Sequence, residues 1–310
     1  MRTLFVMDPL DRIDIAGDST YVLMLESVRR GFPIAMCTVD TLSVRDNQPW
    51  AVTTPVHVTD APPYFHPGEA RGEPLSAYDC VWMRKDPPFD MDYVFATYLL
   101  DLADCLVLND PRTIKLAQEK LYALQWPELC PPTLVTNRLA DVRAFAAEHD
   151  RVVLKPWDGN GGRGIVITQE GDRNLGALVE LLTDEGGSYC IAQRYLPAIE
   201  TGGDKRILLV EGELRGWFAR IPGKDDHRGN MHVGASVISY ELPARDREIC
   251  EALAPRLKAE GLVFVGIDVI GEHLTEINVT SPTGLREVQA LQGRDLGAEL
   301  IDAALSRRST

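Results

Sequence analysis

The chain has 310 residues, of which 45% are hydrophobic and 25% are charged, a composition typical of a globular protein and not of a disordered one. Its length predicts two or three domains. The formal net charge of −14 argues against nucleic-acid and membrane partners, because nucleic acids and anionic membrane surfaces are also negatively charged. There is no signal peptide, no apolar run of about 18 residues and no C-x-x-C spacing, so we expect a cytoplasmic protein with reduced thiols.

Strands and helices alternate over the first part of the chain. Strands are predicted at 3–7, 33–39, 78–83 and 107–108, and helices at 19–30, 91–104 and 111–124. Asp18 or Ser19 caps the first helix, and Gly31 ends it. Residues 45–75 are rich in proline, glycine and charge, which predicts loops and edge structure with one strand at 50–58. The alternation indicates an open parallel α/β layer.

Three charged residues in this part are candidates for a site. Arg84 and Asp86 directly follow the strand 78–83, and ligands of open α/β sheets bind beyond the carboxyl ends of strands. The alternative is an ordinary ion pair in a loop. Lys120 lies on the predicted helix 111–124, where it would by itself be an ordinary surface lysine.

A cluster of prolines, Pro127, Pro131 and Pro132, predicts a domain boundary. After it, strands are predicted at 133–135, 151–155, 164–168, 189–195, 205–210, 213–221, 263–270 and 274–280, and helices at 140–148, 175–182, 244–260 and 295–307. The strands at 205–210 and 213–221 form a hairpin across Glu211-Gly212.

The segment 158–164 reads DGNGGRG and contains a literal G-x-G-x-x-G pattern. A dinucleotide-binding interpretation requires a helix after it, but the β-branched run 165–168 predicts a strand. A strand–loop–strand unit instead indicates a flap whose backbone N–H groups cover phosphates. Lys155 ends the preceding strand, so its ammonium could reach the same phosphates. The alternative interpretation of the loop is a surface hairpin. The segment 192–197, AQRYLP, is either a hinge that binds an adenine edge or a simple edge strand.

A second hairpin, at 263–280, carries candidate metal ligands. We expect Gly271-Glu272-His273 to form a three-residue loop, so that Ile270 pairs with Leu274 and Asp268 lies opposite Glu276. Glu276 and Asn278 then share a face of their strand. Hard cations such as Mg²⁺ take oxygen ligands of this kind, usually together with substrate phosphates. A half-buried hairpin with a solvated polar face is the alternative.

Longer strings connect these features. They are MRKDPPFD at 83–90, LKPWDGNGGRGI at 154–165, AQRYLPAI at 192–199, GDKR at 203–206 and EINVTSPTGLRE at 276–287. Together they resemble the bacterial glutathione synthetase family of ATP-grasp ligases over nearly the whole chain. The resemblance implies an α/β fold with an N-terminal open α/β (pre-ATP-grasp) domain and a two-subdomain ATP-grasp fold. The implied boundaries are 1–122 for the first domain, 123–200 for the small subdomain with the glycine-rich flap and 201–310 for the metal- and substrate-binding subdomain.

The family joins γ-glutamylcysteine to glycine through an acyl phosphate, using ATP and releasing glutathione, ADP and phosphate. The resemblance therefore implies ATP as co-substrate, Mg²⁺ or Mn²⁺ as cofactor, and a homo-oligomer, a tetramer in this family. The alternatives are an ATP-grasp carboxylate–amine ligase of different substrate specificity and a non-catalytic nucleotide-binding regulator. The intact set of Lys155, Asp268, Glu276 and Asn278 argues against the regulator, because a pure binder need not keep a metal-bridging site.

The resemblance also implies roles for single residues. Those that would contact ATP are Lys120, Lys155, Gly161, Gly162, Gly164, Gln193, Arg194, Tyr195, Leu196 and Lys205. The metal ligands would be Asp268, Glu276 and Asn278, and the catalytic groups would be Arg206 and Arg220. The substrate-binding residues would be Arg84, Asp86, Arg228, Asn230 and Ser281. Arg228 and Asn230 belong to a segment, 222–233, that resembles the family's lid.

Overall fold

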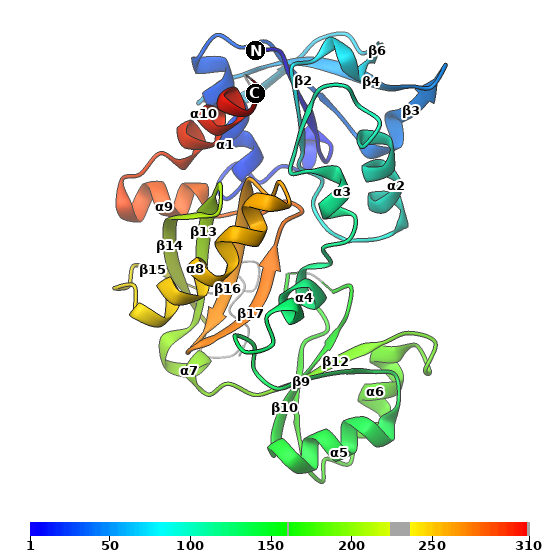
Figure 1. Ribbon diagram of the computed structural model, residues 1–310, viewed down its shortest axis with the longest axis vertical. Helices are drawn as coiled ribbons and strands as arrows, with labels where there is room; N and C mark the ends of the chain where they lie inside the picture. The colour runs from blue at the N-terminus through cyan, green and yellow to red at the C-terminus, as the bar shows by residue number, and fades with distance from the viewer. Residues whose placement is uncertain (160, 224–235, 309–310) are drawn as a thin grey trace.

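The computed structural model describes residues 1–159, 161–223 and 236–308. The described chain forms three β-sheets that follow one another in sequence, and the ribbon places the first sheet at one end of the long axis and the second at the other, with the third between them (Figure 1). No helix within these residues is long and apolar enough to cross a lipid bilayer.

The first sheet confirms the predicted parallel layer. Its strands are β1 (Thr3–Val6), β2 (Ile34–Cys37), β3 (Leu42–Arg45), β4 (Gln48–Val58), β5 (Phe65–Pro67), β6 (Arg71–Pro74), β7 (Cys80–Met83) and β8 (Leu106–Leu108). The order is β3-β4-β2-β1-β7-β8, with β5 and β6 also paired to β4. β1 pairs in parallel with β2 and β7, and β7 pairs in parallel with β8. The proline- and glycine-rich segment forms the antiparallel edge around β4.

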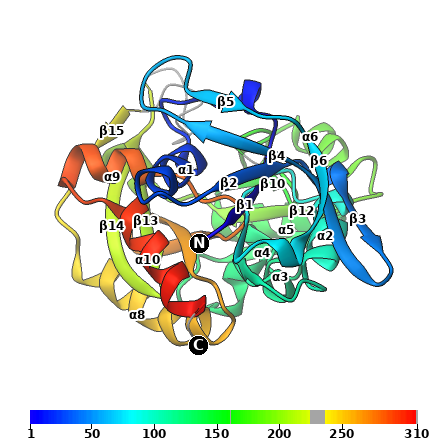
Figure 2. The ribbon, with the colours of Figure 1, turned by 90° about the horizontal axis from the view of Figure 1, so that it is seen from above.

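Helices cover both faces of this sheet. They are α1 (Ser19–Arg29), α2 (Met91–Leu100), α3 (Pro111–Ile114) and α10 (Leu296–Arg308). α1 and α10 lie on one face, and α2 and α3 lie on the other (Figures 1 and 2). Because successive side chains of a strand point to opposite faces, Phe5 packs in the core with Leu23 and Leu300, whereas Leu4 packs with Leu100. The last helix of the chain therefore completes the core of the first sheet.

The second sheet is small and antiparallel. Its strands, in the order β11-β10-β12-β9, are β9 (Thr133–Thr136), β10 (Arg151–Pro156), β11 (Val166–Gln169) and β12 (Cys190–Arg194). The two helices that pack against it are α5 (Leu139–His149) and α6 (Leu175–Thr183). Val142 and Val179 from these helices share a core with Val152 and Leu154 of β10. The glycine segment 158–164 joins β10 to β11, so it is followed by a strand, as predicted.

The third sheet lies between the other two. Its described strands, in the order β15-β14-β13-β16-β17, are β13 (Asp204–Val210), β14 (Glu213–Ile221), β15 (Ser236–Ile238), β16 (Phe264–Ile270) and β17 (His273–Asn278). Three helices accompany it, namely α7 (Ala198–Gly202), α8 (Ala244–Ala259) and α9 (Leu285–Gln292). Leu253 of α8 packs with Ile207, whereas Val288 of α9 packs with Leu208. The sheet is thus covered on both faces by helices.

The hairpin of β16 and β17 corrects the predicted turn but keeps the predicted ligand pair. Ile270 pairs with His273, so the turn has two residues and the expected pairing of Ile270 with Leu274 is wrong. Gly271 has a φ of +59°, which suits a tight turn. A β-bulge then shifts the register at Thr275, whose hydroxyl donates to the Asp268 carbonyl at 3.1 Å. The bulge restores Asp268 opposite Glu276, as expected.

The domain boundaries after residues 122 and 200 stay a prediction. The first sheet lies before residue 122, the second lies between residues 122 and 200, and the third lies after residue 200. Helices α9 and α10 follow the third sheet in the sequence. Helix α10 nevertheless contacts α1, which belongs to the predicted first domain. The spatial unit around the first sheet thus contains residues from both ends of the chain.

A half-buried carboxylate at the edge of the first sheet gives a stability prediction. Burial opposes ionisation of Glu73, but hydrogen bonds from Arg2 (2.7 Å), Tyr78 (2.7 Å) and Thr53 (2.9 Å) outweigh it and lower the pKa to about 2. We expect Glu73→Gln to lower the free energy of unfolding by about 1–3 kcal/mol at pH 7. Since the pKa is lowered from an ordinary 4.5, this deficit shrinks as the pH falls from 4.5 towards 2.

Urea unfolding at pH 7 and at pH 3 measures the deficit. The matched control is Glu69→Gln, because Glu69 is exposed on the same edge and should show little change at either pH. Equal deficits for Glu73→Gln at the two pH values would contradict the role given to its ionised form.

Candidate active site

A cavity of about 420 Å³ opens between the second and third sheets and reaches the loop after β7. Its size is within the range of small-molecule sites, which is about 300–1,000 Å³. Its walls include Lys155 of β10, Arg206 of β13, Glu276 of β17 and Asp86 from the loop that follows β7 of the first sheet. Groups from all three sheets therefore converge on one space.

Most of the predicted site residues line this cavity. They are Asp86, Lys120, Lys155, Gly161, Gly162, Gln193, Arg194, Tyr195, Leu196, Arg206, Arg220, Asp268, Glu276, Asn278 and Ser281. Three further predicted residues, Arg84, Gly164 and Lys205, are placed elsewhere. Arg228 and Asn230 lie outside the described residues, as does most of the segment 222–233.

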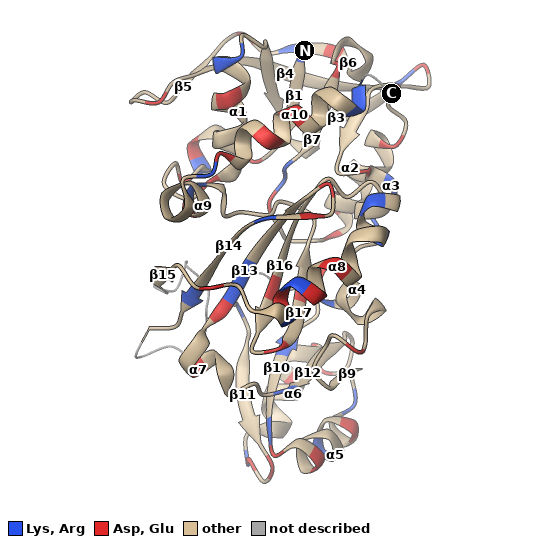
Figure 3. Ribbon diagram, turned by 60° about the vertical axis from the view of Figure 1, so that its left-hand side comes forward, with Lys and Arg blue, Asp and Glu red and all other residues tan. Residues whose placement is uncertain are grey.

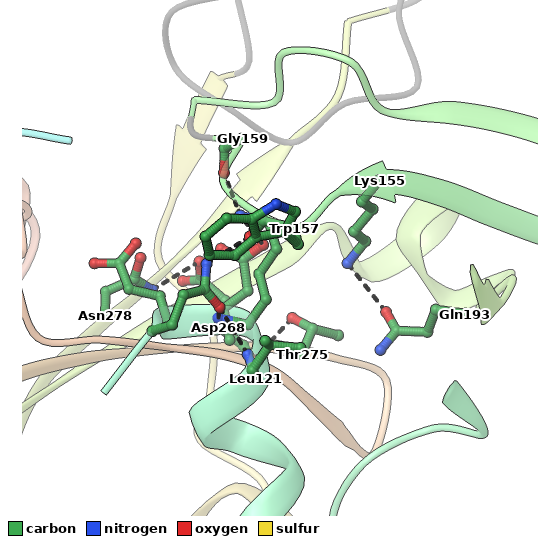
Figure 4. Close-up of polar contacts among 12 residues, drawn as sticks. Leu121, Lys155, Trp157, Gly159, Gln193, Asp268, Thr275 and Asn278 are labelled. Carbon is green, nitrogen blue, oxygen red and sulfur yellow. Dashed lines mark hydrogen bonds and ion pairs between the residues drawn. The ribbon is translucent and has the colours of Figure 1, made fainter. Parts of the chain in front are cut away.

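Lys155 lies at the end of β10, as predicted, and is buried. Its Nζ donates to Gln193 Oε1 at 3.0 Å (Figure 4), and Gln193 Nε2 donates to Thr133 Oγ1 at 3.0 Å. Burial lowers the pKa of Lys155, because the charged ammonium has lost water. A buried cation held by a neutral amide is well suited to an anionic ligand.

Lys120 does not lie on the continuous helix predicted for 111–124. That helix is interrupted after α3, and α4 (Glu119–Tyr122) starts anew with Gln118 as its N-cap. The Lys120 Nζ donates to the Gly159 carbonyl and lies 3.7 Å from Glu276 Oε1. The interruption therefore directs Lys120 towards both the glycine segment and the candidate metal ligands.

The glycine segment needs its glycines for backbone reasons. Gly161, Gly162 and Gly164 have φ values of +58°, +78° and +72°, which side chains rarely adopt. A Cβ on Gly159 would lie 2.4 Å from Pro156 Cγ. Gly164 itself packs over Pro156 and does not line the cavity, so its contribution is to the turn.

Four charged side chains form one network on the cavity face of the third sheet. Arg206 Nε and Nη2 donate to the two oxygens of Asp268 at 2.6 and 3.1 Å. Arg220 Nη2 lies 2.5 Å from Asp204 Oδ2 and 3.0 Å from Asp268 Oδ1. Burial opposes ionisation of Asp268, but both arginines outweigh it and lower its pKa. Figure 3 shows basic and acidic residues on neighbouring strands of this sheet.

Asp204 and Glu119 line the cavity but were not among the predicted residues. Burial raises the pKa of Asp204 to about 7, against the opposing effect of Arg220. Glu119 accepts from Thr280 Oγ1 at 2.6 Å, and burial raises its pKa too. Asp204 could have been found from its spacing, because it is two residues from Arg206 on one strand and so shares its face.

The three predicted metal ligands lie together at one end of the network. Asn278 Nδ2 donates to Asp268 Oδ2 at 3.2 Å (Figure 4), and Glu276 is paired with Asp268 across the hairpin. Within the described residues no cluster of three or more His, Cys, Asp or Glu side chains could hold a metal ion. The predicted set has two carboxylates and one amide, a donor set that suits Mg²⁺ when substrate phosphates complete the coordination.

Arg84 lies just beneath the cavity wall and is only 3% exposed. Its Nε donates to Thr20 Oγ1 at 3.1 Å and its Nη2 to the Pro282 carbonyl at 3.0 Å. Ser281 Oγ, on the wall above, donates to the Arg84 carbonyl at 3.3 Å. Burial lowers the pKa of Arg84, with Asp18 and Asp86 acting against this.

Lys205 points away from the cavity. Its Nζ lies 2.5 Å from Asp246 Oδ1 on α8 and donates to the Gly271 carbonyl at 2.8 Å. Neighbouring residues of a strand face opposite sides, so Lys205 cannot share the cavity face of Arg206. The structure thus gives Lys205 a contact with α8 in place of the predicted contact with ATP.

Comparison with known proteins identifies the family. The model for the prokaryotic glutathione synthetase N-terminal domain matches residues 1–115, and that for the prokaryotic glutathione synthetase ATP-grasp domain matches residues 119–293. Glutathione synthetase of Thermosynechococcus vestitus is 42% identical, over 97% of this chain and 98% of the relative. That of Prochlorococcus marinus is 45% identical, over 97% of each chain.

Solved structures agree on the fold. The D-cycloserine synthetase DcsG superposes with a TM-score of 0.70 at 16% sequence identity, covering 99% of each chain. At this identity the likeness is one of fold alone. The two family models together span most of the sequence, and the chain belongs to the prokaryotic glutathione synthetase family.

Proposed function

We propose that this chain joins γ-glutamylcysteine to glycine in the cavity, using ATP and releasing glutathione, ADP and phosphate. Family membership over the full length supports this ATP-dependent ligase activity. The observation that carries the residue assignments is the convergence of two lysines and two arginines on a group of oxygen donors in one cavity. Such a site can bind a triphosphate and two carboxylate substrates within an acidic protein.

In the proposed mechanism, the cysteinyl carboxylate of γ-glutamylcysteine attacks the γ-phosphorus of ATP. ADP leaves, and the resulting acyl phosphate is attacked at its carbonyl carbon by the glycine amine. Phosphate then departs, so no protein nucleophile is needed. The task of the protein is positioning and charge stabilisation.

Lys120 and Lys155 would bind the phosphates, and the backbone of the glycine segment would cover them. Gln193 to Leu196 of the hinge would contact adenine. Asp268, Glu276 and Asn278 would hold Mg²⁺ or Mn²⁺, which neutralises charge on the β- and γ-phosphates when it is bound. These assignments are supported by the position of the groups on the same cavity.

Arg220 would stabilise the oxyanion of the tetrahedral intermediate, and Arg206 would hold Asp268 in place beside it. Asp86 and Ser281 line the cavity and would bind the peptide substrate. Arg84 would support this wall from beneath, where its guanidinium donates to Thr20 Oγ1 and to the Pro282 carbonyl. Arg228 and Asn230 are proposed for the glycine end by family resemblance alone.

The resemblance also supports a proposal for the setting of the reaction. We propose a cytoplasmic homo-oligomer, a tetramer as in the family, without nucleic-acid or membrane partners. Light scattering of the purified protein measures the oligomeric state directly.

An assay for ADP release tests the function. We expect ADP to appear only when γ-glutamylcysteine, glycine, ATP and Mg²⁺ are all present, with one glutathione formed per ADP. Removal of Mg²⁺ by EDTA should abolish turnover. ADP release with another acid or amine, and none with these, would indicate a ligase of different specificity, whereas ATP binding without turnover would indicate a regulator.

A further inference from the structure

The interruption between α3 and α4 is centred on one buried amide side chain. Gln118 is 9% exposed, and its Oε1 accepts from the backbone N–H groups of Lys120 at 3.0 Å and Leu121 at 2.9 Å. This is an N-cap, which satisfies donors that have no partner within the helix. Because the cap uses only the oxygen, the Nε2 group is left to point out of the helix.

That Nε2 group donates to the Trp157 carbonyl at 2.5 Å. Two residues further on, the Gly159 carbonyl accepts from Lys120 Nζ (Figure 4). The start of α4 is therefore hydrogen-bonded to the backbone at residue 157 and at residue 159, where the glycine segment begins. The indole of Trp157 is itself fixed, because its Nε1 donates to Ser188 Oγ at 3.0 Å.

We infer that Gln118 is a positioning residue for nucleotide binding, whose amide holds Lys120 and the glycine segment in their phosphate-binding arrangement before ATP arrives. This inference rests on the proposed binding of ATP in the cavity. Groups that are already ordered lose less conformational freedom when a ligand binds, so affinity rises. Gln118 does this through Lys120 and the backbone at 157–159, without touching the nucleotide.

The two sets of hydrogen bonds that Gln118 makes require an amide side chain. An amide has an acceptor for the two N–H groups and a donor for the carbonyl, whereas a carboxylate lacks the donor and a thioether lacks both. Gln118→Glu therefore keeps the helix cap and loses the contact with Trp157. Gln118→Met removes both at nearly constant volume.

Nucleotide affinity is the first measurement. For Gln118→Met we expect the Kd for ADP with Mg²⁺, by calorimetry, and the KM for ATP to rise about tenfold, the effect of losing one or two hydrogen bonds. We expect kcat to stay within about threefold, and the KM values for γ-glutamylcysteine and glycine to be unchanged. The matched control is Gln125→Met, because Gln125 is exposed and lies shortly after α4 in the sequence. This variant should leave all these constants unchanged.

Hydrogen exchange separates the two contacts. The amides of 157–164 should exchange faster in both Gln118 variants, whereas those of 119–122 should exchange faster only in Gln118→Met. In a Lys120→Met background, Gln118→Met should weaken ADP binding by much less than tenfold, because the two residues act together.

An ADP affinity within twofold of the wild type for both variants, with unchanged exchange at 157–164, would overturn the inference. The calorimetric result does not depend on turnover. If the wild type made no glutathione but Gln118→Met still weakened ADP binding tenfold, the proposed function would fail and the role of Gln118 would stand.

Discussion

Replacing Glu276 by alanine is expected to reduce kcat by about 100-fold or more while the protein stays folded. Glu276 lies opposite Asp268 in the β16–β17 hairpin, and its Oε1 is 3.7 Å from Lys120 Nζ. Its side chain is 21% exposed and lies at the cavity edge, so its loss leaves no sealed void. Arg206 and Arg220 both bind Asp268, whereas no arginine among the described residues pairs with Glu276, so the variant would lose the less occupied carboxylate of the proposed metal set.

Steady-state kinetics and manganese binding by electron paramagnetic resonance measure this effect together. Glu272→Ala is the matched control, since Glu272 is exposed in the two-residue turn of the same hairpin and should leave kcat unchanged. A Glu276→Ala enzyme with near-normal kcat and normal manganese affinity would remove Glu276 from the metal site.

Arg220→Ala is expected to lower kcat by about 100-fold, with KM values changed by less than about threefold. An interaction made only in the transition state has this signature. Arg220 is 4% exposed and contacts both Asp204 and Asp268. Its removal leaves the buried Asp268 and the half-buried Asp204 without this cation, so the alanine variant should also be less stable, by about 3–5 kcal/mol.

The lysine variant separates the two consequences. Arg220→Lys keeps a positive charge and should recover most of the stability, but it cannot bind both carboxylates in the same geometry and should remain slow. Arg215→Ala, on the same strand but partly exposed beside Glu213, serves as the control. If KM rose and kcat did not fall in the folded lysine variant, Arg220 would be a binding group only.

Much of the fold follows from local patterns. The helix cap at Asp18 is an example, since its carboxylate accepts from the Tyr21 N–H at 2.5 Å as the sequence suggests. The strand after the glycine segment is another, because β-branched residues favour it. The predicted pairing of Asp268 with Glu276 is confirmed, but by a different route. The turn is one residue shorter than predicted and a bulge adds one residue back, and the residue spacing reveals neither feature.

The errors arise where distant parts of the chain meet. The sequence of 111–124 suits a helix throughout, whereas the structure interrupts it at Gln118, which caps α4 and donates to the Trp157 carbonyl. α9 was not expected because its first N–H groups are bound by Ser19 Oγ, from the other end of the chain. Lys205 could have been excluded in advance, because strand neighbours face opposite sides.

The packing of α10 against α1 has a consequence for how the protein is made. The ribosome delivers β1 and α1 first, but Leu300, Ile301 and Ala304 are needed to cover one side of the sheet that β1 belongs to. The part of this face that α10 covers therefore stays exposed until translation has passed these residues, although α1 is already present on the same face. Arg308 pairs with Asp79, whose carboxylate also accepts from the Arg2 N–H, so described residues near both ends of the chain lie close together. A circularly permuted gene that brought α10 ahead of β1 would therefore shorten that exposure.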